Sequence, residues 1–228
     1  MPVVTPFLAL AALPVAFVLG FSFNPIEFSW AVRHGLKPMP EKVRRGAAVI
    51  SRYANFLGDA LIVSFVIVLM LRNSVPAARV GLHLENWKTN LLIGTASGIL
   101  LILLQGLITR STHPRTPGPF AYHAGRGSVL LWLLIFVVGA FSEELWIAFC
   151  LVALMASGLA MPLSVAITVA IFGGVHYGYR FGGVIAVALK GTVSALLFLH
   201  FRSLVVVFFF HFLGNIGSLY WARRLMIR

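Results

Sequence analysis

Two adjacent glutamates, Glu143 and Glu144, stand in the middle of a long apolar stretch. The chain has only 6 acidic residues, and the others are expected in loops or near the ends of apolar stretches: Glu27, Glu41, Asp59, Glu85. Adjacent residues of a helix point about 100° apart, so one carboxylate could face a cavity while the other anchors to a neighbouring helix. Like charges this close favour protonation of one of them. The pair suits base chemistry, although it could also do no more than join helices through hydrogen bonds.

Two other apolar stretches carry polar side chains at helical spacing. Phe172 and His176 are four residues apart, as are His211 and Asn215, and each pair would share one face of a helix. Taken singly, His176 could lie at the membrane surface, and the second pair could form helix–helix hydrogen bonds. Lys190 is a further charge in an apolar stretch, and it could pair with a glutamate or extend to the membrane surface. Convergence of several stretches on one cavity favours a functional site.

The elements that must position these side chains are predicted to be transmembrane helices. The 228-residue chain is 60% hydrophobic and 11% charged, with a mean hydropathy of +0.95, which excludes an ordinary soluble domain. The apolar stretches suit an all-α polytopic bundle rather than an outer-membrane barrel. Basic residues are scattered over loops, so the net charge of +12 does not indicate nucleic-acid binding. The single cysteine, Cys150, is expected to be a small buried hydrophobe.

Hydropathy predicts about seven spans within one transmembrane domain over residues 1–228. The first is interpreted as a retained helix, and the fourth is long enough to require a tilt or a break near the glutamates. The expected spans lie near residues 4–23, 55–71, 90–109, 128–155, 162–178, 183–200 and 204–221.

The distribution of basic residues predicts the orientation in the membrane. Of the 18 Lys and Arg residues, few fall on one of the two sides that seven spans define: Arg72, Arg79, Lys88 and Arg202. The N-terminus is therefore expected outside and the C-terminus in the cytoplasm. Residues 25–53 are predicted to form a basic cytoplasmic loop, in which 41–52 could be a helix that binds anionic headgroups. We expect a multi-pass protein of a prokaryotic cell (cytoplasmic or inner) membrane.

The ordered motifs resemble those of the CPBP family of intramembrane proteases, which includes CAAX prenyl endopeptidases and bacteriocin-processing members. They are Glu143-Glu144, Phe172xxxHis176 and His211xxxAsn215, with Arg202-Ser203-Leu204 ahead of the third. The likeness covers a protease-like core at roughly residues 80–220.

One position departs from the family pattern. The first motif is usually EExxxR, and Ala148 stands at the position of the arginine. This departure leaves two expectations open: a cation supplied from elsewhere, with Arg180 or Lys190 as candidates, or a family member that has lost catalysis and serves as a membrane scaffold.

The resemblance implies hydrolysis of a peptide bond in the membrane. Glu143 would activate water as general base with help from His176, Glu144 would orient the site, and His211 and Asn215 would stabilise the oxyanion. Family members have been described as metal-dependent and as glutamate-type proteases. Glu143, His176 and His211 could hold a divalent metal such as Zn²⁺, but without an HExxH motif we favour direct water activation and assign no cofactor.

Two other classes compete with this interpretation. Met155-Ala156-Ser157-Gly158 faintly resembles the GxSG motif of rhomboid serine proteases, but the first glycine is missing and HxxxN follows the serine. A transporter could use Glu and His at mid-membrane, but the inverted repeats typical of transporters are not apparent. The expected partners are the lipid bilayer and a membrane protein or peptide substrate, which could be a prenylated C-terminus, a leader peptide, a sorting helix or a bacteriocin.

Overall fold

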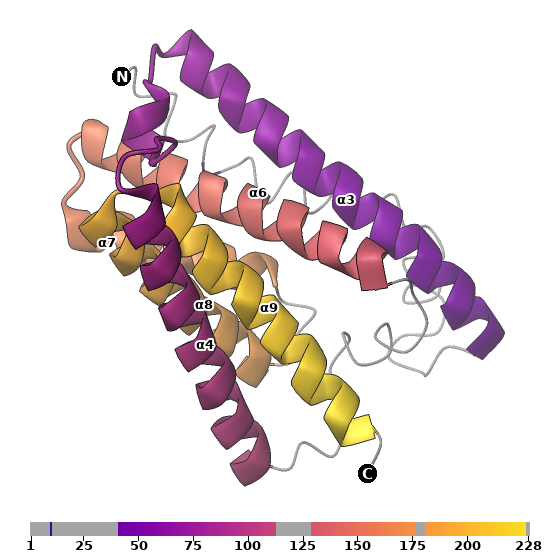
Figure 1. Ribbon diagram of the computed structural model, residues 1–228. Helices are drawn as coiled ribbons and strands as arrows, with labels where there is room; N and C mark the ends of the chain where they lie inside the picture. Colours follow the sequence, from indigo (N-terminus) through magenta and orange to yellow (C-terminus); the bar gives the residue numbers. More distant parts are fainter. Residues whose placement is uncertain (1–9, 11–40, 113–128, 177–180, 227–228) are drawn as a thin grey trace.

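Every element that the structure describes is a helix. The computed structural model describes residues 10, 41–112, 129–176 and 181–226. The elements (Figure 1) are α3 (Glu41–Arg72), the short 3₁₀ helix η1 (Ala77–Val80), α4 (Trp87–Thr112), α6 (Val129–Ala156), α7 (Met161–Val175), α8 (Phe181–Phe201) and α9 (Leu204–Met226). The expected all-α fold is confirmed for these residues, while the predicted span at 4–23 lies almost wholly outside them.

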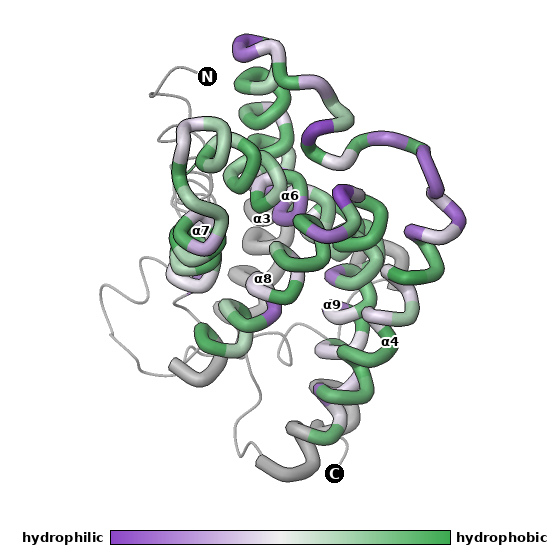
Figure 2. The backbone as a smooth tube through the Cα atoms, turned by 90° about the vertical axis from the view of Figure 1, so that its left-hand side faces the viewer, coloured by the Kyte–Doolittle hydropathy of each residue, from purple (hydrophilic) through white to green (hydrophobic). Residues whose placement is uncertain are grey.

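Four of the described helices are long and apolar enough to cross a membrane. They contain Trp87–Leu107, Leu133–Ala156, Val184–Phe201 and Leu204–Trp221, which match four of the predicted spans. Figure 2 shows that hydrophilic residues gather on the turn between α3 and α4, outside these apolar helices. The total of seven spans and the orientation of the termini stay predictions.

The helix α7 differs from its predicted span. It ends at Val175 and has 15 residues, instead of continuing to residue 178. At 1.5 Å per residue it is about 22 Å long, less than the roughly 30 Å of a hydrocarbon core. Its C-terminal end therefore stops within the bundle, and the next residue is His176.

The helix α6 is the centre of the bundle. It contacts α3, α7, α8 and α9, and every residue from Glu144 to Leu154 is buried. A helix that is apolar on all sides can face lipid or protein, and the two carboxylates on α6 favour the protein interior. The helix is unbroken over 28 residues, so the predicted break near the glutamates is absent. At about 42 Å it exceeds the hydrocarbon thickness, which favours the tilted alternative.

The helix α3 runs without interruption from Glu41 to Arg72 and packs along α6 (Figure 1). The surface helix considered at 41–52 and the predicted span at 55–71 are therefore parts of one helix. Asp59, which the sequence placed near a span end, lies well inside it.

Glycines allow α4 and α9 to pack closely along their length. A methyl group at Gly94 would lie 2.6 Å from the carbonyl oxygen and 3.0 Å from the Cα of Val206. One turn further along α4, a methyl group at Gly98 would lie 2.7 Å from the Cβ of Leu213. Small residues are the usual means of close helix packing in membranes, where lipid tails are as apolar as the helices and backbone proximity gives the attraction.

A turn anchors the start of α9. Gly81 has a left-handed backbone with φ of 78°, and its carbonyl oxygen accepts a hydrogen bond of 3.0 Å from the amide of Leu204. A side chain at Gly81 would overlap that amide. The turn thereby holds the first residue of the helix that carries His211 and Asn215.

We expect Gly94→Ala to lower the stability of the protein and Gly174→Ala to leave it equal or higher. The added methyl at Gly94 meets backbone atoms that cannot rotate away, a cost of about 1–3 kcal/mol for overpacking that outweighs the roughly 1 kcal/mol gain in helix propensity. At Gly174 it meets nothing within 4 Å. Thermal unfolding of both variants in one detergent measures the difference, and equal shifts would contradict this account of α4–α9 packing.

Candidate active site

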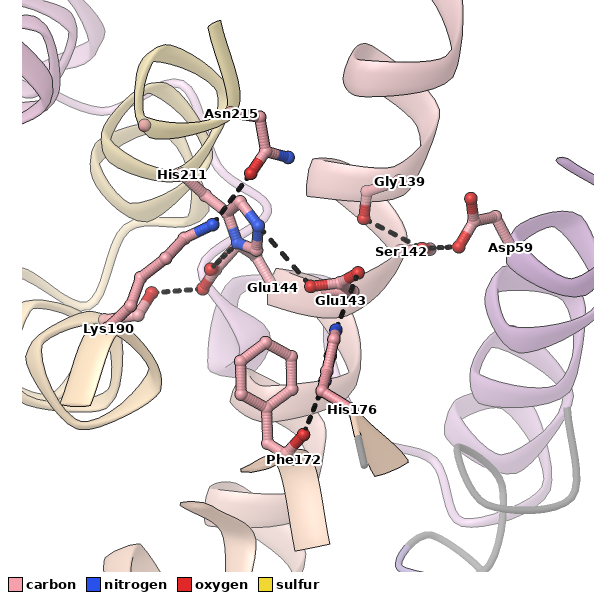
Figure 3. A network of polar contacts seen from close by, with 12 residues as sticks. Asp59, Gly139, Ser142, Glu143, Glu144, Phe172, His176, Lys190, His211 and Asn215 are labelled. Carbon is pink, nitrogen blue, oxygen red and sulfur yellow. Dashed lines mark hydrogen bonds and ion pairs between the residues drawn. The ribbon is translucent and has the colours of Figure 1, made fainter. Parts of the chain in front are cut away.

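Glu143 and Glu144 point in different directions from α6, as their helical spacing predicts. The side chain of Glu143 is 22% exposed and that of Glu144 is 1% exposed. Glu144 accepts a hydrogen bond from Ser194 of α8, and its other oxygen lies 2.6 Å from Nδ1 of His211 on α9. Glu144 therefore joins three helices, while Glu143 faces the centre of the site (Figure 3).

His211 stands between the two glutamates. Its Nδ1 contacts Glu144, and its Nε2 lies 3.4 Å from Oε2 of Glu143. With Glu144 ionised, Nδ1 must carry a proton, because a carboxylate only accepts. In the neutral imidazole, Nε2 then keeps its lone pair and faces a second acceptor. A proton or a bound water is the natural occupant between Nε2 and Glu143.

His176 approaches Glu143 from the end of α7. Its Nδ1 lies 2.7 Å from the carbonyl oxygen of Phe172 and so carries the proton, which leaves Nε2 directed at Oε1 of Glu143, 4.0 Å away. The ring of Phe172 packs edge-on against both imidazoles, with centroids 5.0 Å from His176 and 6.4 Å from His211. Gly191 leaves room for this ring, because a methyl there would lie 2.7 Å from it.

Asn215 lies one turn beyond His211 on α9 and contacts Lys190, for which the sequence predicted no single partner. Lys190 of α8 donates a hydrogen bond of 2.8 Å to its Oδ1. Of the two cations considered as a replacement for the missing arginine, Lys190 is thus part of the site and Arg180 lies outside the described residues. Ala148 itself is fully buried in the core of α6.

Two neighbours of the site were missed by the sequence interpretation. Asp59 of α3 accepts a hydrogen bond of 2.7 Å from Ser142, the residue before Glu143. Its expected place near a span end stays a prediction, because α3 extends beyond the expected span at both ends. The signal that could have identified Asp59 is an acidic residue inside an otherwise apolar helical stretch. Ser194 could have been noticed because it is four residues after Lys190 and shares its face of α8.

The structure gives no support to the serine protease alternative. Ser157 follows the end of α6, and its hydroxyl donates to the carbonyl oxygen of Leu154 at 2.7 Å. The helical rise places it about 20 Å along α6 from Glu143, too far to share the histidines of the site.

The donor types of the site suit a divalent metal. The Nε2 atoms of His176 and His211 both face Glu143, and each imidazole is anchored through Nδ1, an arrangement common around zinc. Among the described residues, however, no group of three or more His, Cys, Asp and Glu side chains is arranged closely enough to hold an ion.

An apolar cavity of about 400 Å³ lies beside the site, between α6, the start of α9 and the turn after η1. Phe141 lines it two residues before Glu143, and Phe208 lines it three residues before His211. The other side chains on these helices that line it are Val137, Leu204, Val205 and Phe209.

A comparison with known families identifies this segment. Residues 125–217 match the family described as Type II CAAX prenyl endopeptidase Rce1-like. These residues, fewer than half of the chain, are similar to CPBP-type proteases. The matched segment includes every catalytic residue predicted from the sequence, and the family that it resembles is a peptidase family. No curated protein and no solved structure matches the chain closely enough to be reported as a relative.

We expect Glu144→Gln to reduce any peptide hydrolysis at this site about 100-fold or more. An amide at this position can present a donor to Nδ1 of His211, which would favour the wrong tautomer, an effect worth about 10⁴ in a serine protease triad. Ser194→Ala removes only one of the donors to Glu144 and should cost less than about 10-fold. Rates at equal protein amount and equal melting temperature test this, and full activity of Glu144→Gln would refute the tautomer argument.

Proposed function

We propose that the chain is an intramembrane endopeptidase in which Glu143 activates the attacking water. The observation that carries the proposal is the convergence of two imidazole Nε2 atoms on the carboxylate of Glu143, at 3.4 Å and 4.0 Å. These groups come from α6, α9 and the end of α7, and together they surround one partly exposed carboxylate within a peptidase-family segment.

In the proposed reaction, Glu143 removes a proton from water as the water oxygen bonds to the carbonyl carbon of the substrate. The same proton is then delivered to the leaving nitrogen as the carbon–nitrogen bond breaks. His176 orients the water and the Glu143 carboxylate. Asn215 donates to the developing oxyanion, and His211, one turn away on α9, does so as an imidazolium that carries a second proton on Nε2. Donors aimed at the transition state lower the barrier. Glu144 holds His211 in place.

A metal-dependent variant of this chemistry would use the same side chains. Glu143, His176 and His211 would hold the ion, which supplies a more acidic bound water and polarises the carbonyl. In either form Glu144 and the Phe172 carbonyl orient the imidazoles, because their contacts with Nδ1 leave Nε2 directed inward.

The apolar cavity supports a substrate with an apolar group near the scissile bond. The family is described as acting on prenylated CAAX proteins, and a prenyl chain is one such group. The cavity lies within one helical turn of Glu143 and His211 and has almost no polar lining. We propose that it receives the apolar part of a membrane-bound peptide.

Replacing Glu143 by Gln is expected to abolish cleavage, because loss of a general base costs about 10²–10⁴ in rate. The comparison is between cells that express the wild type and cells that express Glu143→Gln at equal abundance, with membrane peptides and protein termini mapped by mass spectrometry. New termini that disappear in the variant would establish proteolysis and reveal the substrate class. Identical termini, with the protein folded and its membrane partners unchanged, would contradict the proposal and favour a scaffold or a transporter.

Filling the cavity should weaken substrate binding more than it slows the cleavage step. We expect Val205→Trp to raise KM for a farnesylated CAAX peptide in micelles by about 10-fold or more with kcat little changed, because uniform binding is lost. Val193→Trp, on an exposed part of α8, is the matched control and should have no effect. An unchanged KM in Val205→Trp would show that the apolar group binds elsewhere.

A further inference from the structure

The contact between Lys190 and Asn215 restricts the amide of Asn215 to one orientation. The Lys190 ammonium has three donors and no acceptor, whereas an asparagine side chain has one oxygen acceptor and one NH₂ donor. Asn215 must therefore present Oδ1 to Lys190, at the observed 2.8 Å. Its Nδ2 is the other branch of the planar amide, and Figure 3 shows this nitrogen directed away from Lys190 towards α6.

We propose that Lys190 is a positioning residue that holds the NH₂ group of Asn215 ready to donate to the oxyanion. This inference rests on the proposed peptidase function and extends it to a residue outside the family motifs. Without the ammonium, the two ends of the amide have nearly the same shape and either could face the substrate. An oxygen in that place would repel the oxyanion instead of stabilising it. Lys190 removes this wrong orientation before substrate arrives, which is the preorganisation that oxyanion stabilisation requires.

The placement of Lys190 on α8 supports the proposal. Lys190 and Ser194 are four residues apart and share one face, and they donate to Asn215 and Glu144 respectively. Gly214, the residue before Asn215, leaves room for Leu101 of α4, because a methyl there would lie 2.6 Å from that side chain. One face of α8 thus donates hydrogen bonds to two acceptors of the site, the Asn215 oxygen on α9 and the Glu144 carboxylate on α6.

The same contact accounts for a half-buried cation at Lys190. A charge in an apolar helix is costly unless it is paired, and such residues mark functional sites in membrane proteins. The position in α6 where the family usually carries arginine is the buried Ala148, so α8 supplies the cation of this site.

The test uses single variants of Lys190, with rates taken from the appearance of new termini in membranes and from the cleaved peptide that they identify. Lys190→Met should lower kcat about 10- to 100-fold with KM unchanged, because the lost interaction acts in the transition state. Lys190→Arg, which also offers only donors, should restore most of the rate. Lys190→Gln should restore less, because its amide can donate or accept. Thr192→Val, which removes an α8 hydroxyl that donates to the carbonyl oxygen of Ala188, should behave as wild type.

A double-mutant cycle with Asn215→Ala separates positioning from a structural role. If Lys190 acts through Asn215, Lys190→Met should cost less than about 2-fold in the Asn215→Ala background. An equal loss in both backgrounds, or no loss from Lys190→Met in the wild type, would overturn the inference. Melting temperatures of all variants identify losses that arise from unfolding, and for any variant that unfolds, the Arg and Gln substitutions supply the comparison.

Failure of this inference is distinguishable from failure of the proposed function. Cleavage that is insensitive to Glu143→Gln would refute the peptidase mechanism itself. Cleavage that is lost in Glu143→Gln but intact in Lys190→Met would refute only the role of Lys190.

Discussion

Burial of the Glu144 carboxylate is the constraint on which the rest of the site depends. A carboxylate at mid-membrane is tolerated only when its oxygens are bonded, and Glu144 meets this need through Ser194 of α8 and His211 of α9. These contacts determine how α6 is rotated about its axis. Because adjacent helical residues diverge by about 100°, the same rotation turns Glu143 towards the two imidazoles. A structural carboxylate and a reactive one thus arise from a single pair.

The remaining helices hold this arrangement from outside. Asp59 binds Ser142 and so attaches α3 to α6 beside Glu143. Phe172 packs edge-on against both imidazoles and so links α7 to α9. The turn at Gly81 holds the start of α9. Polar contacts such as Asp59–Ser142 and Lys190–Asn215 join two helices, which suits a setting where lipid offers polar groups no competing partner.

Much of the site was predictable because it depends on local periodicity. A helix has 3.6 residues per turn, so the adjacent residues Glu143 and Glu144 diverge. For the same reason, residues four apart, such as His211 and Asn215, share one face. Other features depend on contacts between distant parts of the chain. Ser194 bonds to a residue 50 positions away, and Asp59 to one 83 positions away. Periodicity says which residues share a face, but not which neighbouring helix that face meets.

The sequence by itself determined that this is a helical membrane protein with acidic, histidine and amide groups on separate apolar helices, since hydropathy and helical spacing are local properties. Only the tertiary structure decided that α7 stops within the bundle at His176, that α3 brings Asp59 to Ser142, and that Lys190 contacts Asn215 rather than a glutamate. The physical reason is that an apolar helix can rotate and shift against its neighbours at little cost. The packing of glycines and the pairing of buried polar groups select one arrangement.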